Sequence, residues 1–154
     1  MPELMDGPAI FVVIGAKEHP NTTVGQILAR TVGRCAYIST DVLQRMLEGG
    51  TASSGPQDAA ALRLHLHHAS LLAKSFLAAG YSVVIEDLNA ATSLEELASA
   101  MQGQAFYGTV LERGIQGAPQ TPDSGLRLDT ADRTPYELAE EILRRVWREG
   151  RFSA

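Results

Sequence analysis

The stretch Ala9 to Thr22, AIFVVIGAKEHPNT, decides how this chain is expected to fold. Its first part, Ala9 to Ile14, is an uninterrupted apolar run rich in β-branched residues, which predicts a strand buried on both faces. A polar loop begins at Gly15, and Thr22 to Val32 then has apolar residues at helical spacing. A buried strand joined by a short loop to a helix is the unit from which parallel sheets are built.

Strand and helix signals alternate along the rest of the chain. Further strands are expected at Cys35 to Ile38, Tyr81 to Glu86 and Leu126 to Leu128, and further helices at Asp41 to Leu47, Asp58 to Ala79, Ser93 to Met101 and Thr134 to Glu149. On the longest helix the predicted buried stripe consists of Leu62, Leu66, Ala69, Leu72, Ala73 and Phe76. The expected fold is α/β, a three-layer α/β/α sandwich around a mostly parallel sheet, in one domain over residues 1–154.

Composition and charge exclude several classes of protein. Of 154 residues, 45% are hydrophobic and 20% are charged, as in globular proteins. The net charge of -5 argues against broad binding to nucleic acids or anionic membranes, which need clustered Lys and Arg. No apolar run approaches the roughly 18 to 20 residues of a membrane span, and the acidic start, Met1 to Pro8, does not resemble a secretion signal. The single cysteine, Cys35, fits a reducing compartment, so we expect a cytoplasmic protein in which Cys35 is a small core residue.

The loop after the first strand lies where parallel α/β proteins usually bind phosphate. The full signature is G-x-x-x-x-G-K-S/T, in which glycines let the backbone wrap the phosphates, lysine reaches their outer oxygens and the hydroxyl holds magnesium. In GAKEHPNT, Gly15 and Thr22 match, but Pro20 replaces the second glycine and Asn21 replaces the lysine. Proline removes a backbone N–H, asparagine removes the cation, and Glu18 adds a like charge. The loop is therefore predicted to be a degenerate Walker A motif.

Two sets of residues are candidates for chemistry at this edge of the sheet. The nucleotide-binding candidates are Gly15, Lys17, Thr22 and Thr23. Either Lys17 or His19 substitutes for the missing lysine, or the segment is an ordinary strand–helix turn capped by Thr22. Asp41, after the second strand, is the candidate catalytic residue, because it can accept a proton from a substrate hydroxyl or hold magnesium through water. A plain helix cap explains Asp41 equally well.

Three further groups of residues are candidates for function. Glu86 and Asp87 end a buried strand, where such folds often place a magnesium-associated acid. The histidines His65, His67 and His68 are close in sequence, but no acidic residue is near them and we expect no metal site. Trp147, beside a basic stretch, is a candidate anchor for a protein partner or for a second copy of the chain.

Taken together, the segments resemble adenylylsulfate (APS) kinases, P-loop kinases that phosphorylate the ribose of APS with ATP. The resembling segments fall in the order of the family. DVLQRML (Asp41 to Leu47) is similar to D-N-V-R-x-x-L, GPQD (Gly55 to Asp58) to S-P-x-D, and LAKSF (Leu72 to Phe76) to V-A-K-x-F. Phe106 to Gly117 resembles the lid segment L-Y-K-K-A-x-x-G-E-I-K-G, and Ala118 to Thr130 resembles A-P-x-N-P-D…V-L-D-T.

The departures from the family pattern concern mostly charged residues. The substrate-binding arginine of the family falls on Gln44, and the lysines of the lid fall on Gly108, Thr109 and Gln116. The stretch between the strand at Tyr81 and the lid-like segment is shorter than in the family. Either one strand–helix unit is therefore missing, or Ser82 to Asp87 takes the place of two such units. The resemblance thus implies a pseudoenzyme with a regulatory or partner-binding role and weak or no nucleotide binding. The alternative is an active small-molecule kinase that uses ATP and Mg²⁺ at a rearranged phosphate site.

Overall fold

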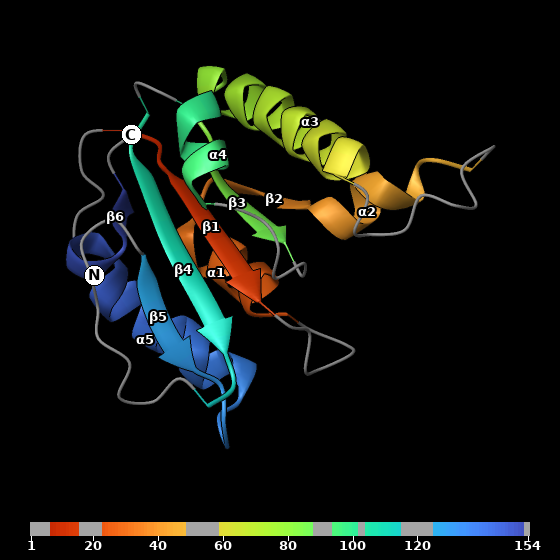
Figure 1. Cartoon of the computed structure of the whole chain (residues 1–154). Helices are drawn as coiled ribbons and strands as arrows, with labels where there is room; N and C mark the ends of the chain where they lie inside the picture. The colour runs from red at the N-terminus through yellow and green to blue at the C-terminus, as the bar shows by residue number, and fades with distance from the viewer. Residues whose placement is uncertain are drawn as a thin grey trace.

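The computed structural model of the chain in Figure 1 describes residues 7–15, 23–48, 59–87, 94–101, 104–114 and 125–152. In chain order the elements are β1 (Ile10–Gly15), α1 (Val24–Val32), β2 (Cys35–Ser39), α2 (Thr40–Arg45), α3 (Ala59–Ala78), β3 (Ser82–Asp87), α4 (Leu94–Ala100), β4 (Phe106–Glu112), β5 (Leu126–Asp129), α5 (Pro135–Glu149) and β6 (Arg151–Phe152). The predicted alternation of strands and helices is confirmed.

The strands form one sheet with β1 at its centre. The order is β2-β3-β1-β4-β5, and all four of these pairings are parallel. Ile10 pairs with Val83 of β3 on one side and with Phe106 of β4 on the other. The two-residue β6 pairs antiparallel with the start of β4. The sheet is therefore mostly parallel, as predicted.

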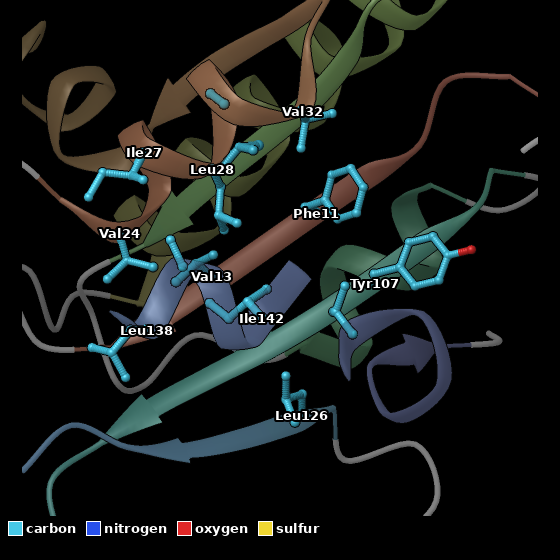
Figure 2. Packing of buried hydrophobic residues seen from close by; sticks show 14 of the residues in the cluster. Phe11, Val13, Val24, Ile27, Leu28, Val32, Tyr107, Leu126, Leu138 and Ile142 are labelled. Atoms are coloured by element: carbon cyan, nitrogen blue, oxygen red, sulfur yellow. The ribbon is translucent and has the colours of Figure 1, made fainter. Parts of the chain in front are cut away.

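Helices cover both faces of the sheet (Figure 1), because β1 sends apolar side chains to each side. Phe11 and Val13 pack with residues of α1 and α5, such as Leu28 and Ile142, in the cluster that Figure 2 shows. The alternate residues of β1 pack on the opposite face with α3 and α4. All six residues of β1 are buried, which confirms the predicted three-layer sandwich.

One central strand, β4, was not predicted from the sequence. Phe106 and Tyr107, which were assigned to a lid-like segment, are buried in β4 between β1 and β5. Gly108 and Thr109 lie inside the same strand and are also buried, so their correspondence to lid lysines does not hold. A glycine and a threonine interrupt the apolar run here, and for this reason the strand pattern was missed.

The predicted buried stripe of α3 was partly wrong. Ala69 and Ala73 are buried as expected, but Leu72 and Phe76 are exposed. The positions that face the sheet follow i, i+4 spacing and include His65 and Leu77, together with Ser70. The side chain of Leu62 lies outside the described residues. Although α3 has 20 residues, neither it nor any other described helix is long and apolar enough to cross a bilayer.

Trp147 belongs to the core cluster on the α5 side of the sheet. Its ring packs edge-on against Phe11 and Tyr107, with centroids 5.4 and 5.2 Å away. Its indole N–H donates to the carbonyl oxygen of Leu143 at 2.6 Å. The candidate anchor Trp147 is thus half-buried against the molecule's own core.

Cys35 is half-buried at the start of β2. Burial raises the pKa of its thiol to about 11. Because the thiolate is the reactive form, the Cys35 thiol is a poor nucleophile at neutral pH. This agrees with the packing role that the sequence predicted for it.

Candidate phosphate-binding site

The carboxyl ends of the parallel strands meet at one edge of the sheet, where ligands bind in open α/β folds. β1 ends there at Gly15, and α1 begins beyond it at Val24. β3 ends at the same edge with Glu86 and Asp87, and Ile14 pairs with Asp87. The edge therefore brings the first predicted phosphate-binding residue next to two acidic residues.

Gly15 is a glycine for a steric reason that the sequence does not reveal. A Cβ atom at this position would lie 2.4 Å from the carbonyl oxygen of Leu111 and 2.7 Å from its Cβ, on β4. Any side chain would therefore push β1 and β4 apart. Gly15 fits the start of a phosphate loop, and its packing against β4 also requires glycine. Lys17 and Thr22, two other predicted nucleotide-binding residues, lie outside the described residues.

Thr23 is the N-cap of α1 and takes part in a capping box. Its hydroxyl oxygen accepts from the backbone N–H of Gln26 at 3.1 Å, and Gln26 Oε1 accepts from the N–H of Thr23 at 3.0 Å. Thr23 Oγ1 also lies 3.4 Å from the phenolic oxygen of Tyr37. The cap that one interpretation gave to Thr22 is thus made by Thr23, which begins α1 through its own side chain.

A buried carboxylate lies at the start of α1. Glu86 is 4% exposed, and its Oε2 accepts from the backbone N–H of Gly25 at 3.0 Å. Its Oε1 accepts from the hydroxyl of Tyr37 on β2. Burial first, and then the hydrogen bond to Glu86, raise the pKa of Tyr37 to about 12, so the phenol stays a proton donor at neutral pH. We refer to Thr23, Gly25, Tyr37 and Glu86 as the Glu86 cluster.

Gly25 allows this carboxylate to approach the helix. A Cβ atom on Gly25 would lie 2.9 Å from Cδ of Glu86 and 3.0 Å from Cε1 of Tyr37. Glycine inside a helix is about 1 kcal/mol less favourable than alanine, so a compensating contact explains its presence here. Glu86 could be singled out from the sequence, but Gly25 and Tyr37 were missed. The signal for Gly25 was a glycine in the first turn of an otherwise regular helix.

The Glu86 cluster places negative charge at the positive end of α1. A helix N-terminus attracts anions through its unpaired N–H groups and its dipole. In this chain the N–H of Gly25 is already bonded to a carboxylate of the same chain. A phosphate group that approaches the start of α1 therefore meets an internal anion, which occupies one donor and repels negative charge.

On the opposite face of the sheet, the end of β3 lies near a buried histidine of α3. Asp87 and His65 are both buried, and neither ring nitrogen of His65 has a hydrogen-bond partner in the described part of the chain. Burial and then the charge of His68 lower the pKa of His65, against the opposing effect of Asp87. His65 is therefore neutral at pH 7. His67 is exposed, so the three histidines of α3 do not share one environment.

Asp41, the predicted catalytic residue, lies in the first turn of α2. Its carboxylate pairs with Arg45 at 3.3 Å, and its side chain is 48% exposed. The N-cap position of α2 is taken by Ser39, so the helix-cap interpretation of Asp41 was wrong by two residues. None of the hydrogen bonds or ion pairs among the described residues joins Asp41 to Gly15 or to the Glu86 cluster.

No protein-family profile matches this sequence, and no curated protein matches it either. Solved structures do. The chain is similar to a hexameric APS kinase from Thiobacillus denitrificans, with a TM-score of 0.63 and 17% identity over 96% of this chain but only 30% of that one. It is also similar to the APS kinase of Mycobacterium tuberculosis in complex with AMPPNP and APS, with a TM-score of 0.61 and 17% identity over 90% of this chain and 96% of that one.

A third similar structure is the tunicamycin resistance protein of Deinococcus radiodurans, with a TM-score of 0.63 and 14% identity over 96% of this chain and 99% of that one. At such identities the likeness establishes the fold alone. The chain thus has the fold of these APS kinases, as its sequence segments predicted.

Proposed function

We propose that this chain is an APS-kinase-like pseudoenzyme, a regulatory or partner-binding domain of the cytoplasm that binds nucleotide weakly or not at all. One observation carries the proposal: Pro20 and Asn21 stand where a phosphate-binding loop has glycine and lysine. A charge-assisted hydrogen bond contributes about 1.5 to 3 kcal/mol, so loss of the lysine alone weakens binding about tenfold or more. The rate suffers further, because charge stabilisation dominates phosphoryl transfer.

The Glu86 cluster supports the same conclusion from the helix side of the loop. The N–H of Gly25 is held by the Glu86 carboxylate, and this adds negative charge where a nucleotide would bring its phosphates. Pro20 removes one loop donor and Asn21 removes the cation. All three features act in one direction, since each leaves fewer positive or donating groups for an anion.

The test restores the signature with the double variant Pro20→Gly, Asn21→Lys. By isothermal titration calorimetry with ATP and Mg²⁺, we expect weak or undetectable binding to the natural chain and a gain of about tenfold or more in the variant. Glu140→Gln, at an exposed position of α5, is the matched control because it changes the net charge by the same amount without altering the loop sequence. A folded double variant with no gain, or tight binding by the natural chain, contradicts the proposal.

An active kinase is the second candidate function. It is favoured by the likeness to an APS kinase solved with AMPPNP and APS, and by Asp41 lying just after β2. In that case Lys17, Thr22 and Asp41 would carry the reaction with ATP and Mg²⁺. Lys17→Ala distinguishes the two: it abolishes magnesium-dependent ATP binding in an active kinase and changes nothing in the pseudoenzyme. A thermal-shift series with ATP, ADP, APS and phosphorylated APS measures the difference, because ligands stabilise the folded state.

A further inference from the structure

The exposed apolar side chains of this molecule are concentrated on two neighbouring helices. Among the described residues, nine large hydrophobic side chains are exposed, and eight of them lie in α2, in α3 or shortly after either helix. The ninth is Tyr136 on α5. α2 and α3 lie together on one side of the sheet (Figure 1). Exposed apolar residues are ordinary when scattered, but a gathering of this kind is typical of an interaction surface.

α3 carries apolar residues on both of its faces. Ala69, Ala73 and Leu77 are buried against the sheet. On the solvent side, Leu64 and Leu71 are exposed and lie two helical turns apart, so they follow one line along the helix. Leu72 and Phe76, four residues apart, are exposed along its border. We call Leu64, Leu71, Leu72 and Phe76 the outer face of α3. Among the described residues, the inner face of α3 packs on the sheet, whereas the four side chains of the outer face stay exposed and are available to a partner.

The charge of α3 indicates which kind of partner fits. Between Ala59 and Ala78 the helix has two cationic residues, Arg63 and Lys74, and no acidic residue, in a chain with a net charge of -5. Arg63 lines a groove of about 510 Å³ whose other wall includes Glu95 of α4. Lys74 has no ion-pair partner in the described part of the chain. A second copy that used the same face would bring cations against cations, which disfavours it.

We propose that the outer face of α3 docks an amphipathic helix of a partner protein. The apolar side chains of that helix would lie along Leu64 and Leu71, and its acidic side chains would flank them, toward Lys74. In recognition of this type, apolar side chains at helical spacing make the main contact, and charged residues at the rim of the surface determine which partner binds. The inference rests on the partner-binding function proposed above and names the surface that performs it.

The test uses a fluorescent three-heptad peptide with Leu at positions a and d and Glu at e and g, and a matched peptide with Lys in place of Glu. By fluorescence anisotropy with the full chain, we expect saturable binding of the Glu peptide and about tenfold or weaker binding of the Lys peptide. Leu71→Glu should abolish binding of the Glu peptide, and Lys74→Glu should weaken it about tenfold while strengthening the Lys peptide. Tyr136→Glu, at the exposed apolar position of α5, outside both α2 and α3, is the control and should bind as the natural chain does.

Three outcomes overturn the docking proposal: neither peptide binds, both bind equally well, or Tyr136→Glu is as damaging as Leu71→Glu. Self-association of the natural chain in sedimentation velocity, abolished by Leu71→Glu, would show a second copy on this face and would also overturn it. ATP titrations on the same samples separate the two proposals. Tight nucleotide binding would contradict the proposal of a pseudoenzyme. The docking proposal is tested by the peptide-binding results alone.

Discussion

The Glu86 carboxylate and the backbone N–H of Gly25 are joined by a buried hydrogen bond of 3.0 Å, which links the end of β3 to the first turn of α1. The two residues are 61 positions apart in sequence. The bond satisfies one of the N–H groups that every helix start leaves without a partner in the helix. Changes to either side of this contact should therefore affect the stability of the fold as well as the candidate site.

Gly25→Ala should destabilise the protein, although the same change inside an ordinary helix stabilises it by about 1 kcal/mol. The new Cβ would lie 2.9 Å from Cδ of Glu86, and relieving that overlap should cost about 1 to 3 kcal/mol. Urea unfolding followed by the fluorescence of the single tryptophan, Trp147, measures the change. Ser75→Ala on the exposed side of α3 is the control and should be neutral or slightly stabilising. A Gly25→Ala protein as stable as the natural one would show that Glu86 is not held against α1.

Tyr37→Phe should lower the free energy of unfolding by about 1 to 3 kcal/mol, because it leaves a buried oxygen of Glu86 without its donor. Tyr136→Phe is the matched control, since its side chain is largely exposed, and it should stay within about 0.5 kcal/mol of the natural chain. Equal stability of the two variants would argue against the hydrogen bond.

The stability of the protein should fall as the pH is lowered through the range in which His65 titrates. Burial lowers the pKa of His65 in the folded state, so the unfolded chain binds the proton more readily. Stability due to neutral His65 is present above the unfolded pKa of about 6.5 and is lost as the pH falls toward the folded value.

His65→Leu removes this titration together with two buried nitrogens that have no hydrogen-bond partner in the described part of the chain. We expect the variant to be more stable at pH 7 by about 1 kcal/mol and to lose less stability between neutral and mildly acidic pH. His67→Asn, at an exposed position, should keep the slope of the natural chain. Thermal unfolding across this pH range gives the comparison, and identical slopes for His65→Leu and the natural chain would refute the assignment.

Gly15→Ala should cost about 3 kcal/mol or more, because its Cβ would lie 2.4 Å from a backbone oxygen of β4. Gly33→Ala is the instructive comparison. Gly33 has φ +81 and ψ 140, a conformation that residues other than glycine rarely adopt. Apart from its chain neighbours, no atom of the described residues lies within 4 Å of the place that a Cβ would take, so alanine there meets only backbone strain, of about 1 to 3 kcal/mol. Chemical denaturation of both variants compares the cost of steric overlap at Gly15 with that of backbone strain at Gly33. A smaller loss of stability in Gly15→Ala than in Gly33→Ala would mean that β1 and β4 can separate.

Much of the fold could be predicted because β1 is a continuous apolar run and β3 has the β-branched core Val83 to Ile85, and turn residues bound both strands. β4 escaped prediction because Gly108 and Thr109 interrupt its pattern, although both are buried in the sheet. The inner face of α3 was assigned only in part, since a helix with apolar residues on both sides gives no single stripe to follow.

The candidate site was predictable only where a local pattern exists. Gly15 could be found from the strand–loop–helix order, and Glu86 from its place at a strand end. That Glu86 contacts Gly25 and Tyr37 depends on which strands become neighbours, and no short stretch of sequence encodes this. The requirement for glycine at position 15 likewise arises from Leu111 on a strand far along the chain.

The central position of β1 has a consequence for how the protein is made. Ile10 pairs with Val83 and Phe106, so β1 is synthesised well before either of its neighbours in the sheet. Until they emerge, a wholly apolar strand carries two open edges, the condition under which nascent chains aggregate or recruit chaperones. Truncated chains that end before β4 should therefore be insoluble however intact their first residues are.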